Sequence, residues 1–115
     1  MANPAIKTLQ LTGNGASTQN SNPLPLNLRS SPFHVGIGVS TDGSTTGYTV
    51  QYTFNDPSEG LSGATWFDHP DLSGKVANAD GNIAFPVTAV RLCLNASGTD
   101  TVTARFIQAG VTSSR

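Results

Sequence analysis

The sequence predicts an all-β protein: an antiparallel β-sandwich or jelly-roll-like domain with an extended N-terminal arm. Only 11% of the 115 residues are charged, and the polarity comes instead from Ser, Thr, Asn and Gln. A composition rich in Thr, Val and Gly favours strands over helices. Apolar residues alternate with a period of two in short stretches, with turn-forming residues about every ten positions, which is typical of sandwiches and jelly rolls. The length fits one domain.

The N-terminal part predicts a strand followed by an arm. The stretch AIKTLQLT (5–12) alternates as a strand, whereas 13–32 is rich in Asn, Ser and Pro and argues against helix. Because Pro23 and Pro25 favour extended backbone, we expect either an arm ordered on a neighbouring subunit or a long surface loop. We therefore divide the chain into a strand and arm over 1–32 and a sandwich body over 33–115. The candidate partner-binding residues of the arm are Leu24, Leu26 and Leu28. If the arm projects, its deletion leaves a folded body.

The segments 33–40 and 48–54 each alternate and flank the turn residues Asp42 and Gly43, which predicts a β-hairpin. Further along, we expect a short strand around 64–70, a tight turn over 78–82, and two last strands within 83–94 and 101–110, with a break or edge position at Pro86. The predicted core comprises the apolar residues on the alternating faces: Phe33, Val35, Ile37, Val39, Tyr48, Val50, Tyr52, Phe54, Trp66, Val90, Leu92, Leu94 and Phe106.

The heptapeptide ATWFDHP (64–70) is a candidate catalytic or metal site, because it combines the single Trp with an Asp and a His. Hydrolysis would require a nucleophile beside a His that a carboxylate orients, and the chain has no G-x-S-x-G elbow. The bond between His69 and Pro70 favours turn geometry. We expect Trp66 to bury its ring, Asp68 to turn the chain, and the protein not to be an enzyme; no catalytic residue is assigned.

Metal and cofactor sites are not expected either. Two His and one Cys, well separated, do not supply the ligands of a zinc site. Loop carboxylates at 56, 59, 68, 71 and 80 could converge on calcium, but the spacing of a calcium loop is missing. Cys93 lies in an apolar stretch, where a buried inert thiol is expected.

Charge and hydropathy exclude two classes of partner. The net charge is −1 without a basic stripe, so direct binding to nucleic acid is not expected. No apolar run approaches the roughly 18 residues of a membrane span, and the first residues lack the features of a secretory signal.

Two features suggest surfaces for binding. Gly36 and Gly38 lie within a strand pattern, which indicates a sheet face stripped of side chains so that another group can approach closely. Trp66, Tyr48 and Tyr52 could stack on a glycan, although both Tyr share the predicted core face.

Four segments of the chain carry a resemblance to a known class of protein: YTVQYTFNDP, ATWFDHPDL, ANADGNIAFPVTAVRLCLNA and TVTARFIQAG. They resemble small virion structural proteins of tailed double-stranded DNA bacteriophages. The resemblance covers about 33–110, and size and strand pattern are similar to the head decoration, or cement, proteins of short-tailed phages. It implies a capsid decoration protein that binds and stabilises the outside of the major capsid protein shell. The implied partners are the major capsid protein and a second copy of the chain, and the implied location is the capsid surface after synthesis in the host cytoplasm. The alternatives are another virion component, such as a tail, connector or head fibre piece, and a carbohydrate-binding host-attachment module.

Overall fold

The computed structural model describes residues 5–26, 30–31, 34–56, 58, 60–95, 98–108 and 111–112. The predicted all-β antiparallel fold is confirmed: each pairing between the described strands is antiparallel. The strands are β1 (Ala5–Thr12), β2 (Gln19–Asn20), β3 (Leu24–Pro25), β4 (Ser30–Ser31), β5 (Val35–Thr41), β6 (Tyr48–Thr53), β7 (Trp66–Asp68), β8 (Ala79–Ile83), β9 (Ala89–Leu94), β10 (Thr101–Gln108) and β11 (Val111–Thr112).

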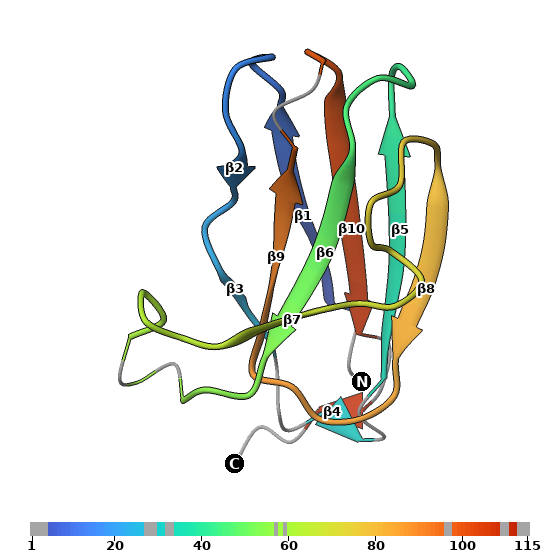
Figure 1. The fold of residues 1–115 in the computed structure, drawn as a ribbon. Helices are drawn as coiled ribbons and strands as arrows, with labels where there is room; N and C mark the ends of the chain where they lie inside the picture. Colours follow the sequence, from blue (N-terminus) through green and yellow to red (C-terminus); the bar gives the residue numbers. More distant parts are fainter. Residues whose placement is uncertain are drawn as a thin grey trace.

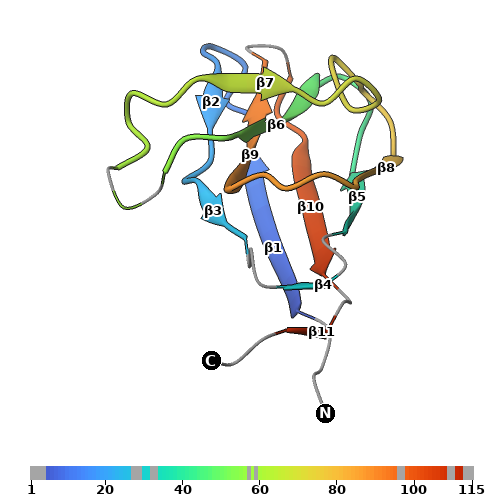
Figure 2. The same ribbon diagram turned by 90° about the horizontal axis from the view of Figure 1, so that it is seen from below.

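Two sheets face one another (Figure 1 and Figure 2). The back sheet has the order β1-β10-β5-β8. The front sheet has the order β2-β9-β6-β7, with β3 pairing with β9 on the same side as β2. The short strands β4 and β11 form a separate two-stranded ribbon.

The space between the sheets holds one apolar cluster to which both contribute. Alternation produces it: in β10, Val102, Ala104 and Phe106 are buried while the residues between them face outward. Most residues of the predicted core lie in this cluster: Val35, Ile37, Val39, Tyr48, Val50, Val90, Leu92, Leu94 and Phe106. The hydroxyl of buried Tyr48 donates to the carbonyl of Ala77 at 2.6 Å, and burial raises the pKa of that hydroxyl.

Three predicted core residues lie elsewhere. Phe54 is 52% exposed, because β6 ends at Thr53 and Phe54 lies past the covered part of the strand. Trp66 is half-buried on the outer face of the front sheet, and Tyr52 is partly buried at the edge of the core. Phe33 lies outside the described residues.

The predicted hairpin between 33–40 and 48–54 is wrong. Strand β5 pairs with β10 and β8, whereas β6 pairs with β9 and β7, so the connection around Asp42 and Gly43 crosses from the back sheet to the front sheet. Alternation on two consecutive strands requires only that each strand have one buried face, and strands of opposite sheets satisfy this equally well. The hairpin of this region is instead β6–β7.

The described part of 13–32 is not a projecting arm. Gln19 and Asn20 pair with the end of β9, and Leu24 and Pro25 pair with its start, so β2 and β3 form an edge of the front sheet. Leu24 and Leu26 pack against the core, and Leu26 N–H donates to the carbonyl of Thr88. Leu28 lies outside the described residues. The boundary at 32 therefore does not separate an arm from a body.

The tight turn predicted over 78–82 is also wrong, because Ala79–Ile83 form strand β8. Gly81 does not have the positive φ of a turn glycine. A Cβ at Gly81 would lie 3.0 Å from Cε1 of His69, so the glycine admits the imidazole instead of turning the chain.

Candidate docking surface

Four aromatic side chains contact one another near the ends of β6 and β8. Both strands end toward the bottom of Figure 1. We call these four side chains the aromatic cluster: Tyr52, Phe54, Phe67 and Phe85. Three segments supply them. Tyr52 of β6 is the register partner of Phe67 of β7, Phe54 follows Tyr52 by two positions, and Phe85 lies just past the end of β8.

The rings contact one another in two stacked and three edge-on pairs. Tyr52 stacks on Phe67 with 6.0 Å between ring centroids, and Phe54 stacks on Phe85 with 6.1 Å. Edge-on contacts of 5.5–5.8 Å link the two stacks. Since such pairs contribute about 0.5–1.5 kcal/mol each, the rings hold one another in place. The cluster is therefore a preorganised surface.

The aromatic cluster remains open to solvent despite this packing. Phe54, Phe67 and Phe85 are 52%, 45% and 45% exposed, and they are adjacent. Scattered apolar residues on a surface are ordinary, but contiguous exposed rings are typical of a binding surface. Phe, Tyr and Trp are also enriched in the energetically dominant parts of protein interfaces.

The heptapeptide 64–70 is divided between two faces. Trp66 and Asp68 point to the outer face of the front sheet, where the guanidinium of Arg91 lies 4.4 Å above the Trp66 ring. Arg91 Nε donates to Gln51 Oε1 at 2.7 Å, and Gln51 Nε2 donates to Asp68 Oδ1 at 2.7 Å. Asp68 is thus the end of a hydrogen-bonded ladder across three strands and does not orient a histidine.

His69 is buried and structural. Its Nδ1 accepts the backbone N–H of Asp71 at 3.2 Å, which leaves Nε2 to carry the proton and donate to the carbonyl of Asn82 at 2.8 Å. Both ring nitrogens are engaged, so the imidazole joins the segment after β7 to β8. This use of both nitrogens leaves none for a nucleophile.

Cys93 and the described carboxylates have ordinary structural surroundings. Burial raises the pKa of the Cys93 thiol, which donates to Gln51 Oε1 at 3.2 Å. Asp56 accepts the N–H of Ser58, and this bond lowers the pKa of Asp56. Across the described residues, no three His, Cys, Asp or Glu side chains come close enough to hold a metal ion, and Glu59 lies outside them. No helix in the same residues is long and apolar enough to cross a membrane.

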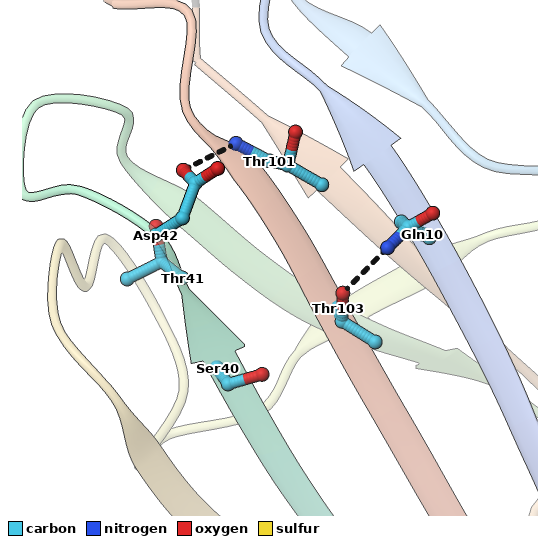
Figure 3. Close-up of a pocket in the computed structure, with 6 residues that line it drawn as sticks. All are labelled: Gln10, Ser40, Thr41, Asp42, Thr101 and Thr103. Carbon is cyan, nitrogen blue, oxygen red and sulfur yellow. Dashed lines mark hydrogen bonds between the residues drawn. The ribbon is translucent and has the colours of Figure 1, made fainter.

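A shallow polar pocket of about 300 Å³ lies on the outer face of the back sheet (Figure 3). Much of its hydrogen-bonding capacity is used internally: Asp42 Oδ1 accepts the N–H of Thr101 at 2.9 Å, and Gln10 Nε2 donates to Thr103 Oγ1 at 3.0 Å. None of the described residues that line it is aromatic. These lining residues therefore offer no ring on which a sugar could stack.

The side chains that the sequence offered for glycan stacking are not assembled into a site. Tyr48 is fully buried, one face of Trp66 is covered by Arg91, and Tyr52 is partly buried between other rings. Sequence reasoning did not single out Phe67 and Phe85 for binding. The positions of Phe54 and Phe85, one and two residues beyond the end of a strand, could have indicated rings at an open end, whereas Phe67 lies within β7 and has no such signal.

No protein-family profile and no curated protein sequence matches the chain. Among solved structures, the chain is similar to that of the infectious bursal disease virus Gx strain, with 14% identity and a TM-score of 0.46 over 95% of this chain and 34% of that one. It is also similar to the IMPa metallopeptidase from Pseudomonas aeruginosa (21% identity, TM-score 0.46, 92% of this chain and 12% of that one). A third similarity is to a family 16 carbohydrate-binding module (10% identity, TM-score 0.40, 83% of this chain and 70% of that one). The chain thus spans about a third of the first structure's length and less of the second. At these scores the likeness is one of general β architecture and says nothing about what this chain binds.

Proposed function

We propose that this protein is a non-catalytic structural component of a bacteriophage virion, a decoration protein that docks on the outside of the capsid shell through the aromatic cluster. The exposure of three contiguous Phe rings is the observation that carries the proposal. The sequence resemblance to virion structural proteins supplies the partner, the major capsid protein.

The energetics suit such a role. Burial of a fully exposed Phe side chain contributes about 1.5–3 kcal/mol, and each of these rings, which is about half exposed, can contribute about half of that on docking. The three rings therefore supply the apolar centre of a docking contact of modest affinity, to which the surrounding surface must add. Protein that binds only the assembled shell stabilises it by mass action. If copies are linked in pairs, simultaneous contacts on a repeating lattice raise the overall affinity further.

The test is co-sedimentation of purified protein with expanded empty shells, assembled from the major capsid protein that the same genome encodes. Wild type is expected to sediment with the shells, and the double variant Phe54→Ser, Phe85→Ser is expected to bind at least about tenfold more weakly, since it loses two anchor rings. Val76→Ser is the matched control, because Val76 is 44% exposed and follows Lys75, which is bridged to Tyr48 at the other end of β6.

Retention of the double variant on shells to the same extent as wild type would overturn docking through the cluster. A wild type that ignores shells but binds a glycan array would instead favour host attachment. In that case the double variant and a Trp66→Ala variant show which aromatic surface binds the sugar.

A further inference from the structure

Among the described residues, no contact explains the glycines at 36 and 38 on the outer face of β5. Neither has a positive φ. A Cβ at Gly38 would meet nothing within 4 Å, and a Cβ at Gly36 would make only an ordinary contact of 3.9 Å with the carbonyl oxygen of Ile107. Glycine in the interior of a strand costs stability relative to residues with side chains. No described contact of the protomer offsets this cost, and a group that approaches from outside would do so.

Other glycines of the chain show the contrast. A Cβ at Gly13 would lie 2.7 Å from the carbonyl oxygen of Gly98, and one at Gly47 would collide with the side-chain amide of Asn95. Gly98 itself has a φ of 77°. These positions require glycine because of the fold, whereas Gly36 and Gly38 do not.

The two glycines form the floor of a furrow between rows of side chains. In the register of the back sheet, Gly38 lies between Arg105 of β10 and Asp80 of β8. At about 4.8 Å per strand, the two charged residues are about 10 Å apart, one on each side of the furrow. Both are exposed, and no ion pair joins them in the part of the chain that the structure describes. A shallow apolar depression of about 310 Å³ over Gly38 is lined by both Arg105 and Ile107.

We propose that this face binds the same face of a second copy of the chain, about a two-fold axis that runs parallel to β5 and passes above Gly36 and Gly38. Such an axis places β10 of each protomer opposite β8 of the other. Arg105 of each copy then faces Asp80 of its partner, so one residue pair provides two reciprocal ion pairs. The side chains at 36 and 38 are absent from both copies, which lets the two sheets approach closely along the axis.

The arrangement of charges on this face favours a second copy of the chain as its binding partner. An isologous interface requires a surface that is complementary to itself, and opposite charges at equal distances from a central strand satisfy that requirement. Ile107, which is 40% exposed beside Gly36, can fill the space above the partner's glycine. The face lies on the opposite side of the molecule from β7 (Figure 2), which carries Phe67 of the aromatic cluster, so the proposed dimer face and the β7 part of the cluster are different surfaces.

The first test is sedimentation equilibrium of the full chain. Wild type is expected to dimerise, and Gly38→Val is expected to raise the dissociation constant about tenfold or more, because the added side chain fills the furrow. Since Val fits the open space and favours strands, the variant keeps its fold, as its circular dichroism and melting temperature will show. Gly63→Ala, at another position where a Cβ meets nothing, is the control. The proposal is overturned if wild type stays monomeric up to about 1 mM, a concentration above which a dimer would be too weak to matter. It is also overturned if Gly38→Val dimerises as tightly as wild type.

The second test uses charge reversal and identifies the pairing directly. Arg105→Asp and Asp80→Arg should each abolish self-association, because each brings like charges together across the axis. An equimolar mixture of the two variants should form a heterodimer, since all facing charges are then opposite again. Failure of the mixture to associate, while wild type dimerises, would show that another surface is used. Neither result depends on a capsid, so this proposal can fail while the proposed function holds, and the reverse.

Discussion

Asp100 and Thr46 bind each other twice, although 54 positions separate them in the sequence. Oδ2 of Asp100 accepts the N–H of Thr46 at 2.9 Å, and the N–H of Asp100 donates to Thr46 Oγ1 at 2.9 Å. The same Oδ2 accepts the N–H of Thr45 at 2.8 Å. These bonds fasten the β5–β6 connection to the β9–β10 connection, and both connections cross between the sheets.

The Asp100 contacts predict an acid-sensitive contribution to stability. The N–H groups of Thr46 and then Thr45 donate to this carboxylate and lower its pKa below the ordinary value of an aspartate. A folded-state pKa below the unfolded value means that the stabilisation is complete above about pH 4 and is lost as the pH falls through the folded-state pKa. Asp100→Asn should therefore lower the free energy of unfolding at neutral pH, and the difference from wild type should shrink in acid.

Urea denaturation of both proteins from neutral pH to below pH 3 measures this difference. Asp71→Asn is the control, because no side-chain hydrogen bond of Asp71 occurs among the described residues. A gap between wild type and Asp100→Asn that stays constant with pH would contradict the role assigned to the carboxylate.

Leu24 tests whether β3 belongs to the sandwich. Its side chain is partly buried against the core, so Leu24→Ala should cost about 1–2 kcal/mol of unfolding free energy, less than the about 2–5 kcal/mol expected for fully buried Leu92→Ala. Chemical denaturation of both variants gives the comparison. A Leu24→Ala variant as stable as wild type would instead support the prediction that this segment is a free arm. Deletion of 13–31 removes both β2 and β3 from the front sheet and should therefore unfold the domain.

The two hydrogen bonds of the His69 imidazole can be tested by locating its ring proton and by substituting the residue. Nitrogen chemical shifts in a ¹⁵N-labelled sample should show the proton on Nε2, as donation to Asn82 requires. His69→Phe leaves the Asn82 carbonyl and the Asp71 N–H without these partners, which should cost about 1–3 kcal/mol per unsatisfied group. A proton on Nδ1 would exclude the bond from Asp71.

Substitutions of Phe106 and Phe67 compare how much the core and the aromatic cluster each contribute to stability. Phe106 is 1% exposed and Phe67 45%, so we expect Phe106→Ala to cost about 3–5 kcal/mol and Phe67→Ala less than half as much. Thermal and urea unfolding measure both. Equal losses would mean that the cluster is needed to fold the domain, and its substitutions would then be unsuited to docking experiments.

Alternation of apolar residues was sufficient to predict the all-β class and most of the core. Val35, Ile37 and Val39 are buried because period-two spacing places them on one side of a strand, whatever the strand's neighbours. The first strand is found at its predicted bounds, Ala5–Thr12, for the same reason.

Strand pairing depended on contacts that local sequence does not contain. The bonds between Asp100 and Thr46 that fix the cross-over of β5 and β6 join distant segments. In 13–32, Pro and Asn suggested an arm, although Pro25 fits an edge position paired with Ala89 of β9. Phe54 follows the alternation of β6, but its exposure depends on where the covering sheet ends. These are tertiary properties, and the aromatic cluster is one of them.

Cryo-electron microscopy of the virion that contains this chain tests docking through the aromatic cluster most directly. We expect the sandwich on the outer surface of the shell, with Phe54, Phe67 and Phe85 within about 4.5 Å of apolar side chains of the major capsid protein. A reconstruction in which these rings face solvent, or in which the chain occupies no site on the shell, would contradict the account.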